Sequence, residues 1–199
     1  MIARLHKSIT VAIIMAINRE KRGVLTMKQA EAFLTTRKEE ETAYIGKILG
    51  QTITEPLVIA LQGELGTGKT VFVRGSAAGL DVEEPVFSPT FVLLKIYHGR
   101  LAVYHFDFYR LSPDEEPDAL GFEEYLPGDG VAFIEWAERL PRLLPAEYLQ
   151  INIERFYDDK GEGRRLWFYP HGHLASQVIE CIIEAITWRT DGTLNIQQD

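Results

Sequence analysis

Residues 63–70, Gly-Glu-Leu-Gly-Thr-Gly-Lys-Thr, constrain the fold of this 199-residue chain more than any other segment. They fit the pattern G-x-x-x-x-G-K-[ST], which is typical of loops that bind the phosphates of nucleoside triphosphates. The apolar run 57–61 before the loop predicts a buried parallel strand, and residues 71–78 after it predict a helix that ends near Gly79. A strand, a glycine-rich loop and a helix in this order predict a P-loop α/β fold.

The residue types of the loop suit an anionic ligand. Glycines let backbone N–H groups turn toward a phosphate, and the N-terminus of the following helix adds further donors. We expect Lys69 to reach the β- and γ-phosphates of a nucleoside triphosphate and the Thr70 hydroxyl to bind Mg²⁺. The predicted nucleotide contacts within the loop are Glu64, Leu65, Gly66, Thr67, Gly68, Lys69 and Thr70.

Other apolar segments predict the elements around the loop. We expect helices over 39–50 and around 178–186, a strand over 131–134, and two hairpins, formed by 91–97 with 101–106 and by 149–156 with 165–169. The predicted fold class is therefore α/β, with a P-loop NTPase-like central, mostly parallel sheet, flanking helices and antiparallel hairpin additions. We divide the chain into an N-terminal extension (1–30), a P-loop ATPase domain (31–174) and a C-terminal amphipathic helix with a tail (175–199).

The N-terminal segment leaves two interpretations open. Its apolar run 9–17 is too short to span a bilayer, and no small-residue cleavage site of a signal peptide follows it. The run is either an extra helix packed on the domain or part of an upstream extension, with Met27 as the natural start.

Charge and cysteine content narrow the class of protein. The formal net charge of −8, with acidic clusters at 39–41 and 114–124, argues against stand-alone binding of nucleic acid. We therefore expect no DNA partner and no membrane association. The single cysteine, Cys181, excludes a disulfide framework and fits a cytoplasmic location.

The second half of a nucleotide site should come from neighbouring strand ends. A P-loop needs an acidic partner for Mg²⁺, and both Asp107 and Glu135 directly follow apolar runs. Either carboxylate fits this position. Thr90, in a turn-like segment after the helix that follows the P-loop, is a candidate to sense the γ-phosphate or to complete the coordination of Mg²⁺, as hydroxyls of switch loops do.

Five motifs in series resemble the bacterial TsaE (YjeE) family between about residues 37 and 170. They are the P-loop, Ser-Pro-Thr-Phe at 88–91, His-Phe-Asp-Phe-Tyr-Arg-Leu at 105–111, Leu-Gly-Phe-Glu-Glu-Tyr-Leu at 120–126 and Ile-Glu-Trp-Ala-Glu at 134–138. The resemblance implies a P-loop ATPase, slow on its own, that supports threonylcarbamoyladenosine (t6A) modification of tRNA. It also implies a partner, the TsaB–TsaD complex, in which TsaD transfers the threonylcarbamoyl group, so this protein would contact tRNA only indirectly.

The same resemblance implies roles for individual residues. Thr70 and Glu135 match the Mg²⁺ pair, and Thr42 matches a helix-start threonine that contacts the nucleotide. Asp107 matches the acid of the His-Phe-Asp motif, a candidate for positioning the attacking water, although Glu135 also remains open for that role. Asp107 and Lys69 are thus the expected catalytic residues. Trp136 matches a residue beside the nucleotide site.

Other readings of the P-loop remain open. A small-molecule kinase would need a lid rich in arginine, whereas residues 114–124 are acidic; a GTPase would need an Asn-Lys-x-Asp segment, which the sequence lacks. A nucleotide-gated assembly protein without significant turnover would keep the P-loop but tolerate loss of the catalytic acid. Arg74 and Arg110 are candidates for an arginine finger, and the sequence does not choose between them.

Overall fold

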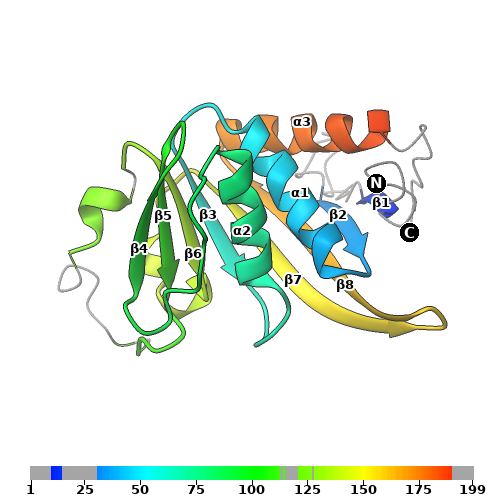
Figure 1. Ribbon diagram of the computed structural model, residues 1–199, viewed down its shortest axis with the longest axis horizontal. Helices are drawn as coiled ribbons and strands as arrows, with labels where there is room; N and C mark the ends of the chain where they lie inside the picture. The colour runs from blue at the N-terminus through cyan, green and yellow to red at the C-terminus, as the bar shows by residue number, and fades with distance from the viewer. Residues whose placement is uncertain (1–9, 15–30, 113, 115–120, 127, 190–199) are drawn as a thin grey trace, which may run out of the picture.

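A single eight-stranded sheet carries three α-helices on one of its faces (Figure 1). The computed structural model describes residues 10–14, 31–112, 114, 121–126 and 128–189. The strands follow one another across the sheet in the order β1-β2-β8-β7-β3-β6-β5-β4. The elements along the chain are β1 (Thr10–Ile14), β2 (Glu31–Thr36), α1 (Glu39–Thr52), β3 (Leu57–Gln62), α2 (Lys69–Gly79), β4 (Leu94–His98), β5 (Ala102–Asp107), the 3₁₀ turn η3 (Glu123–Tyr125), β6 (Val131–Glu135), the 3₁₀ turns η4 (Ala137–Arg139) and η5 (Pro141–Leu143), β7 (Tyr148–Asp158), β8 (Gly161–His171) and α3 (His173–Arg189).

Four parallel strands form the centre of the sheet. β3 pairs in parallel with β6 on one side and with β7 on the other, and β6 pairs in parallel with β5. Antiparallel strands extend the sheet on both sides, β4 beside β5, and β8, β2 and β1 beyond β7. The predicted α/β class, with a parallel centre and antiparallel hairpin additions, is confirmed.

Alternate residues of the central strands enter two separate cores. Leu57, Ile59 and Leu61 of β3 face the helices α1, α2 and α3, while Val58 and Ala60 face the opposite side, which is covered by irregular segments within 108–126 and 137–144. Because β3 is buried on both faces, its sequence is a continuous apolar run rather than an alternating one. This is the pattern from which the strand was predicted.

The helices α1 and α2 touch backbone to backbone. A Cβ atom placed on Gly75 of α2 would lie 1.9 Å from the carbonyl oxygen of Ala43, and one on Gly46 of α1 would lie 2.3 Å from that of Phe72. Only glycine allows two helices to approach this closely. The contact places the start of α1 beside the start of α2, where the P-loop ends.

Two sequence predictions need correction. Residues 10–14, within the segment that one interpretation made a helix, form the edge strand β1, because Thr-Val-Ala-Ile-Ile is rich in β-branched residues and pairs with β2. Residues 91–93, predicted as strand, form a turn in which the backbone N–H groups of Val92 and Leu93 both donate to the Pro89 carbonyl at 2.8 Å. The late hairpin is longer than predicted, with 11 residues in each strand.

The C-terminal helix shares the main core. Five apolar residues of α3 are buried in the same cluster as α1, α2 and the sheet: Ala175, Val178, Ile179, Ile182 and Ile186. The predicted amphipathic helix is confirmed. Much of the acidic stretch 114–124 falls outside the described residues. Among the residues that the structure describes, no helix is long and apolar enough to cross a membrane.

The substitution Gly75→Ala should lower the free energy of unfolding by about 2 kcal/mol, because the overpacking at the Ala43 carbonyl outweighs the helix propensity gained with alanine. Urea denaturation measures this change. Lys47→Ala, on the exposed side of α1, is the matched control and should alter stability by less than about 0.5 kcal/mol. Equal stability of the Gly75 variant and the wild type would contradict the close helix contact.

Candidate nucleotide-binding site

The P-loop connects the end of β3 to the start of α2 with three glycines in left-handed backbone conformations. The φ angles are +134° at Gly63, +76° at Gly66 and +108° at Gly68, which is the N-cap of α2. The hydroxyl of the buried Thr67 donates to the Glu64 carbonyl at 3.0 Å and closes the loop on itself. With no side chain capping α2, its first N–H groups face the loop, as phosphate binding requires.

Lys69 occupies the mouth of this loop. Its ammonium group donates to the carbonyls of Gly63 at 2.6 Å and Glu64 at 2.9 Å, and lies 3.9 Å from the ring centroid of Trp136. Burial lowers the pKa of Lys69, while the nearby carboxylates, Glu135 first, act in the opposite direction. A bound phosphate group would place negative charge beside the ammonium and so favour the charged form of Lys69, which burial disfavours.

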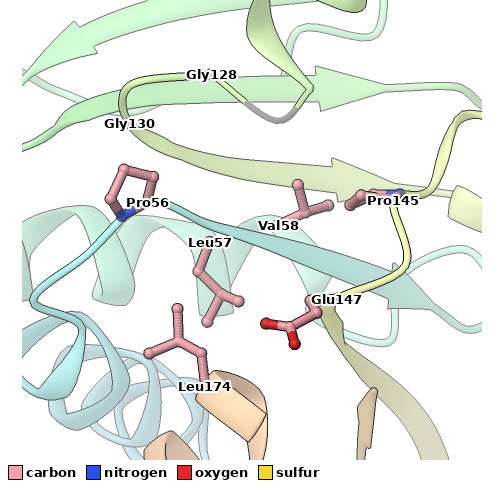
Figure 2. Close-up of a pocket in the computed structure, with 8 residues that line it drawn as sticks. All are labelled: Pro56, Leu57, Val58, Gly128, Gly130, Pro145, Glu147 and Leu174. Atoms are coloured by element: carbon pink, nitrogen blue, oxygen red, sulfur yellow. The ribbon is translucent and has the colours of Figure 1, made fainter. Parts of the chain in front are cut away.

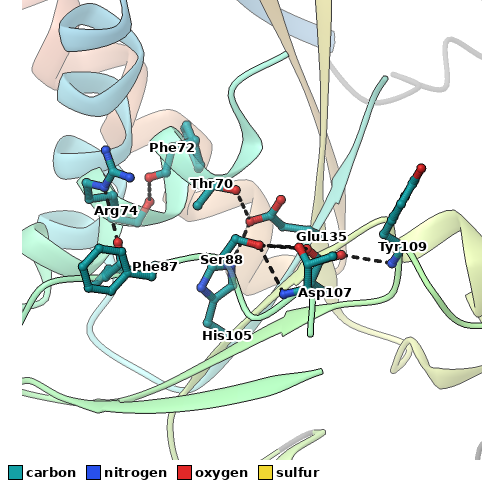
Figure 3. A network of polar contacts seen from close by, with 12 residues as sticks. Thr70, Phe72, Arg74, Phe87, Ser88, His105, Asp107, Tyr109 and Glu135 are labelled. Atoms are coloured by element: carbon teal, nitrogen blue, oxygen red, sulfur yellow. Dashed lines mark hydrogen bonds and ion pairs between the residues drawn. The ribbon is translucent and has the colours of Figure 1, made fainter. Parts of the chain in front are cut away.

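Thr70 and Glu135 are in direct contact. The Thr70 hydroxyl donates to Oε1 of Glu135 at 2.7 Å, and the Glu135 side chain is buried at the carboxyl end of β6 (Figure 3). The two residues predicted as the Mg²⁺ pair are thus brought together from segments 65 residues apart. A hydroxyl and a carboxylate are oxygen ligands of the kind Mg²⁺ prefers.

These side chains would need help to complete a metal site. Within the part of the chain that the structure describes, no group of three or more His, Cys, Asp or Glu could hold a metal ion. Mg²⁺ at Thr70 and Glu135 would therefore take its remaining ligands from water and from substrate phosphates. That is the usual arrangement for Mg²⁺ at nucleotide sites.

Asp107 lies next to Glu135 and is held by several donors. The two residues are Cα partners in the parallel pairing of β5 with β6. Oδ2 of Asp107 accepts hydrogen bonds from the hydroxyls of Thr90 and, at 3.1 Å, Ser88, while Oδ1 accepts the Tyr109 backbone N–H at 3.0 Å (Figure 3). The candidate switch threonine and the candidate catalytic acid therefore belong to one polar network.

The two remaining predicted residues flank the loop. Trp136 follows Glu135 with a left-handed backbone (φ +60°), which turns its ring onto Lys69 and against Tyr109, 5.0 Å away between centroids. Thr42 is buried beneath Gly68 and its hydroxyl lies 2.8 Å from that of Thr36. Thr42 is therefore close to the loop, although its hydroxyl is already paired within the protein.

Comparison with known proteins places this arrangement in a family. The family model for the threonylcarbamoyl adenosine biosynthesis protein TsaE matches residues 36–165. The chain belongs to the TsaE family. The motif resemblance is thereby confirmed, and every residue of the site lies inside the matched stretch.

Individual members of the TsaE family are similar at moderate identity. The tRNA threonylcarbamoyladenosine biosynthesis protein TsaE of Treponema pallidum is 42% identical over 127 residues, covering 64% of this chain and 94% of that protein. The protein of the same name from Bacillus subtilis is 43% identical over 128 residues, covering 64% and 80%. The crystal structure of Bacillus subtilis YdiB superposes with a TM-score of 0.67 and 35% identity, covering 78% of this chain and 95% of that one.

The structure adds two residues that sequence reasoning did not assign to this TsaE-family site. His105, buried in β5, contacts Glu135. Arg155, from strand β7, which is distant in sequence but adjacent to β3, donates to the Leu65 carbonyl at 3.2 Å on the outside of the P-loop. His105 was detectable in principle, because it is two residues before Asp107 and so shares its strand face; nothing local to Arg155 links it to the loop.

The candidate finger arginines have other contacts. Nε of Arg74 donates to the Val86 carbonyl at 3.4 Å, and the guanidinium of Arg110 lies 5.3 Å from the ring centroid of Phe91. In these positions neither arginine is committed to the carboxylates of the site.

A separate cavity of about 300 Å³ lies at the opposite edge of the sheet, at the amino ends of β3 and β6 (Figure 2). It is lined by Pro56, Leu57, Val58, Gly128, Gly130, Pro145, Glu147 and Leu174. Its lining is apolar apart from the Glu147 carboxylate, so it offers no cation to a nucleotide. Ligands of parallel sheets bind at the carboxyl ends of the strands, where the P-loop and its acidic partners are.

Proposed function

We propose that this TsaE-family protein binds ATP with Mg²⁺ at residues 63–70 and hydrolyses it in support of threonylcarbamoyladenosine modification of tRNA. The observation that carries the proposal is the 2.7 Å bond from Thr70 to Glu135, because it joins the P-loop to a buried strand-end carboxylate. That pairing is what a P-loop needs to hold Mg²⁺ beside the phosphates. Family membership supplies the biological role.

The residues of the site divide the work of hydrolysis. Lys69, now bonded to loop carbonyls, would turn to the β- and γ-phosphates and neutralise their charge. Mg²⁺ when bound supplies further positive charge at the phosphate oxygens, and Thr70 and Glu135 would hold it. Asp107 would orient the water that attacks the γ-phosphorus, releasing ADP and inorganic phosphate.

Thr90 is suited to report the state of the nucleotide. Its hydroxyl donates to Asp107 and its loop is otherwise half-exposed. A γ-phosphate in the site would compete with Asp107 for this hydroxyl, so the turn that follows would shift between two arrangements. Switch loops respond to a γ-phosphate in this way.

We propose that a partner completes the site and that this partner is the TsaB–TsaD complex. The turn after Thr90 exposes Phe91 and Val92, by 87% and 60%, directly beside the catalytic network. Cations lie over the exposed aromatic rings of this surface: the guanidinium of Arg110 is 5.3 Å from the ring centroid of Phe91, and the ammonium of Lys95 is 5.4 Å from that of Phe87, which is also exposed. A partner with an apolar patch and an acidic rim fits this surface, whereas the overall charge of −8 disfavours direct docking of tRNA.

Replacement of Asp107 by asparagine should leave ATP affinity within about threefold of wild type and lower the hydrolysis rate roughly 100-fold, because orientation of the water is lost while phosphate contacts remain. Calorimetry measures the affinity and single-turnover phosphate release measures the rate. The control is Asp159→Asn, an exposed aspartate at the tip of the β7–β8 hairpin, which should change neither. If the Asp107 variant hydrolyses ATP at the wild-type rate, Asp107 does not orient the attacking water and another residue must do so.

Addition of the TsaB–TsaD complex should raise steady-state phosphate release by at least about tenfold, and Phe91→Ser should reduce that stimulation. The matched control is Tyr157→Ser, because Tyr157 is also an exposed aromatic (71%) but lies on the far hairpin. Phosphate release that does not respond to the complex would favour nucleotide-gated assembly. Transfer of phosphate to a small molecule would favour a kinase.

A further inference from the structure

His105 is a buried polar residue whose position is set by strand geometry. It lies in β5 with no exposed surface, two residues before Asp107, so both side chains project from the same face of the strand. β5 runs parallel to β6, which ends in Glu135, the Cα partner of Asp107. His105 is thereby aimed diagonally at Glu135, and its Nε2 lies 2.9 Å from Glu135 Oε1 (Figure 3).

The hydrogen-bond pattern fixes which atom carries the proton. A carboxylate only accepts, so Nε2 of His105 is the donor. Nδ1 is buried and has no hydrogen-bond partner among the described residues. His105 therefore makes a single, directed hydrogen bond, from Nε2–H to Oε1 of Glu135.

Two donors converge on one oxygen of Glu135. His105 and Thr70 both bind Oε1, from β5 and from the start of α2. Among the described residues, no donor to Oε2 accompanies them, so the lone pairs of Oε2 are the ones left for a cation or its water. The side chain is pinned in one orientation before any ligand arrives.

Core packing alone does not account for this histidine. An apolar side chain of similar size would fill the space between the strands without burying a ring nitrogen, Nδ1, that has no hydrogen-bond partner among the described residues. The hydrogen bond from His105 to Glu135, a candidate metal ligand, provides a functional reason for a polar side chain at this buried position. Outer residues that orient a ligand commonly change metal affinity 10- to 100-fold.

We propose that His105 is a positioning residue, which acts through Glu135 to hold the carboxylate where it and Thr70 receive Mg²⁺. This inference rests on the proposed function and assigns a further residue to it. His105 itself contacts neither the nucleotide nor the metal. Its effect should therefore appear in Mg²⁺-dependent binding and not in binding of the nucleotide alone.

The test compares two amide variants of the full chain. The amide nitrogen of glutamine can reach the place of Nε2, whereas that of asparagine is shorter and cannot, so His105→Gln and His105→Asn are matched in polarity and differ in reach. Calorimetry with a non-hydrolysable ATP analogue, in Mg²⁺ and in EDTA, gives the enhancement of affinity by the metal. We expect the Asn variant to lose about tenfold of that enhancement with its EDTA affinity unchanged, and the Gln variant to retain most of it.

A double variant checks that His105 acts through Glu135. If it does, adding His105→Asn to Glu135→Gln should cause no further loss of the enhancement. An Asn variant with the full enhancement would overturn the proposal, as would loss of affinity in both media or loss of the fold in both amide variants, since either shows a purely structural role. A wild-type protein that binds the analogue without any help from Mg²⁺ would instead contradict the proposed function.

Discussion

The parallel register of β3, β6 and β5 is the constraint on which the site depends. Leu61 near the end of β3 is paired with Glu135, and Glu135 with Asp107, so three strands end in one row. The P-loop leaves β3 one residue beyond Leu61, which sets its lysine and threonine opposite the two carboxylates. A shift of one residue in either pairing would turn a carboxylate to the other face of the sheet. The apolar cores on both faces oppose such a shift.

Charge is the second constraint. Asp107 and Glu135 are almost completely buried beside each other, which is unfavourable for two ionised groups unless donors and cations compensate. Hydrogen bonds from hydroxyls, a backbone N–H and an imidazole N–H compensate part of the cost of burying the two carboxylates. Lys69 adds one nearby positive charge. An ATP molecule brings further negative charge into the same space. In the proposed function, Mg²⁺ held by Thr70 and Glu135 would offset this added negative charge.

The sequence predicted the parts of the structure that are encoded locally. The P-loop, its strand and helix, and the acid at the end of 131–134 are contiguous patterns, and the five motifs together identified the family. Contacts set by the tertiary fold were less accessible. Arg155 reaches the P-loop only because β7 lies beside β3, and the bond from His105 to Glu135 requires the register of two strands distant in sequence.

Local composition also misled in two places. Residues 91–93 are apolar and typical of a strand. However, the N–H groups of Val92 and Leu93 donate to the Pro89 carbonyl, which forms a turn that exposes Phe91. The N-terminal apolar run suggested a helix as one possibility, whereas residues 10–14 gain hydrogen bonds by adding to the free edge of β2. In both cases the conformation was decided by the hydrogen-bond partners available in the folded protein. The periodicity of apolar residues in the sequence does not reveal these partners.

The central claim is that residues 63–70 bind ATP through Lys69. Calorimetric titration of ATP with Mg²⁺ into wild-type protein and the Lys69→Ala variant tests it most directly, with thermal melting to show that the variant is folded. The account predicts saturable binding of one ATP per wild-type chain and at least about a 100-fold loss of affinity in the variant, since the cation at the phosphates is removed. Retention of wild-type affinity by a folded Lys69→Ala protein would contradict it.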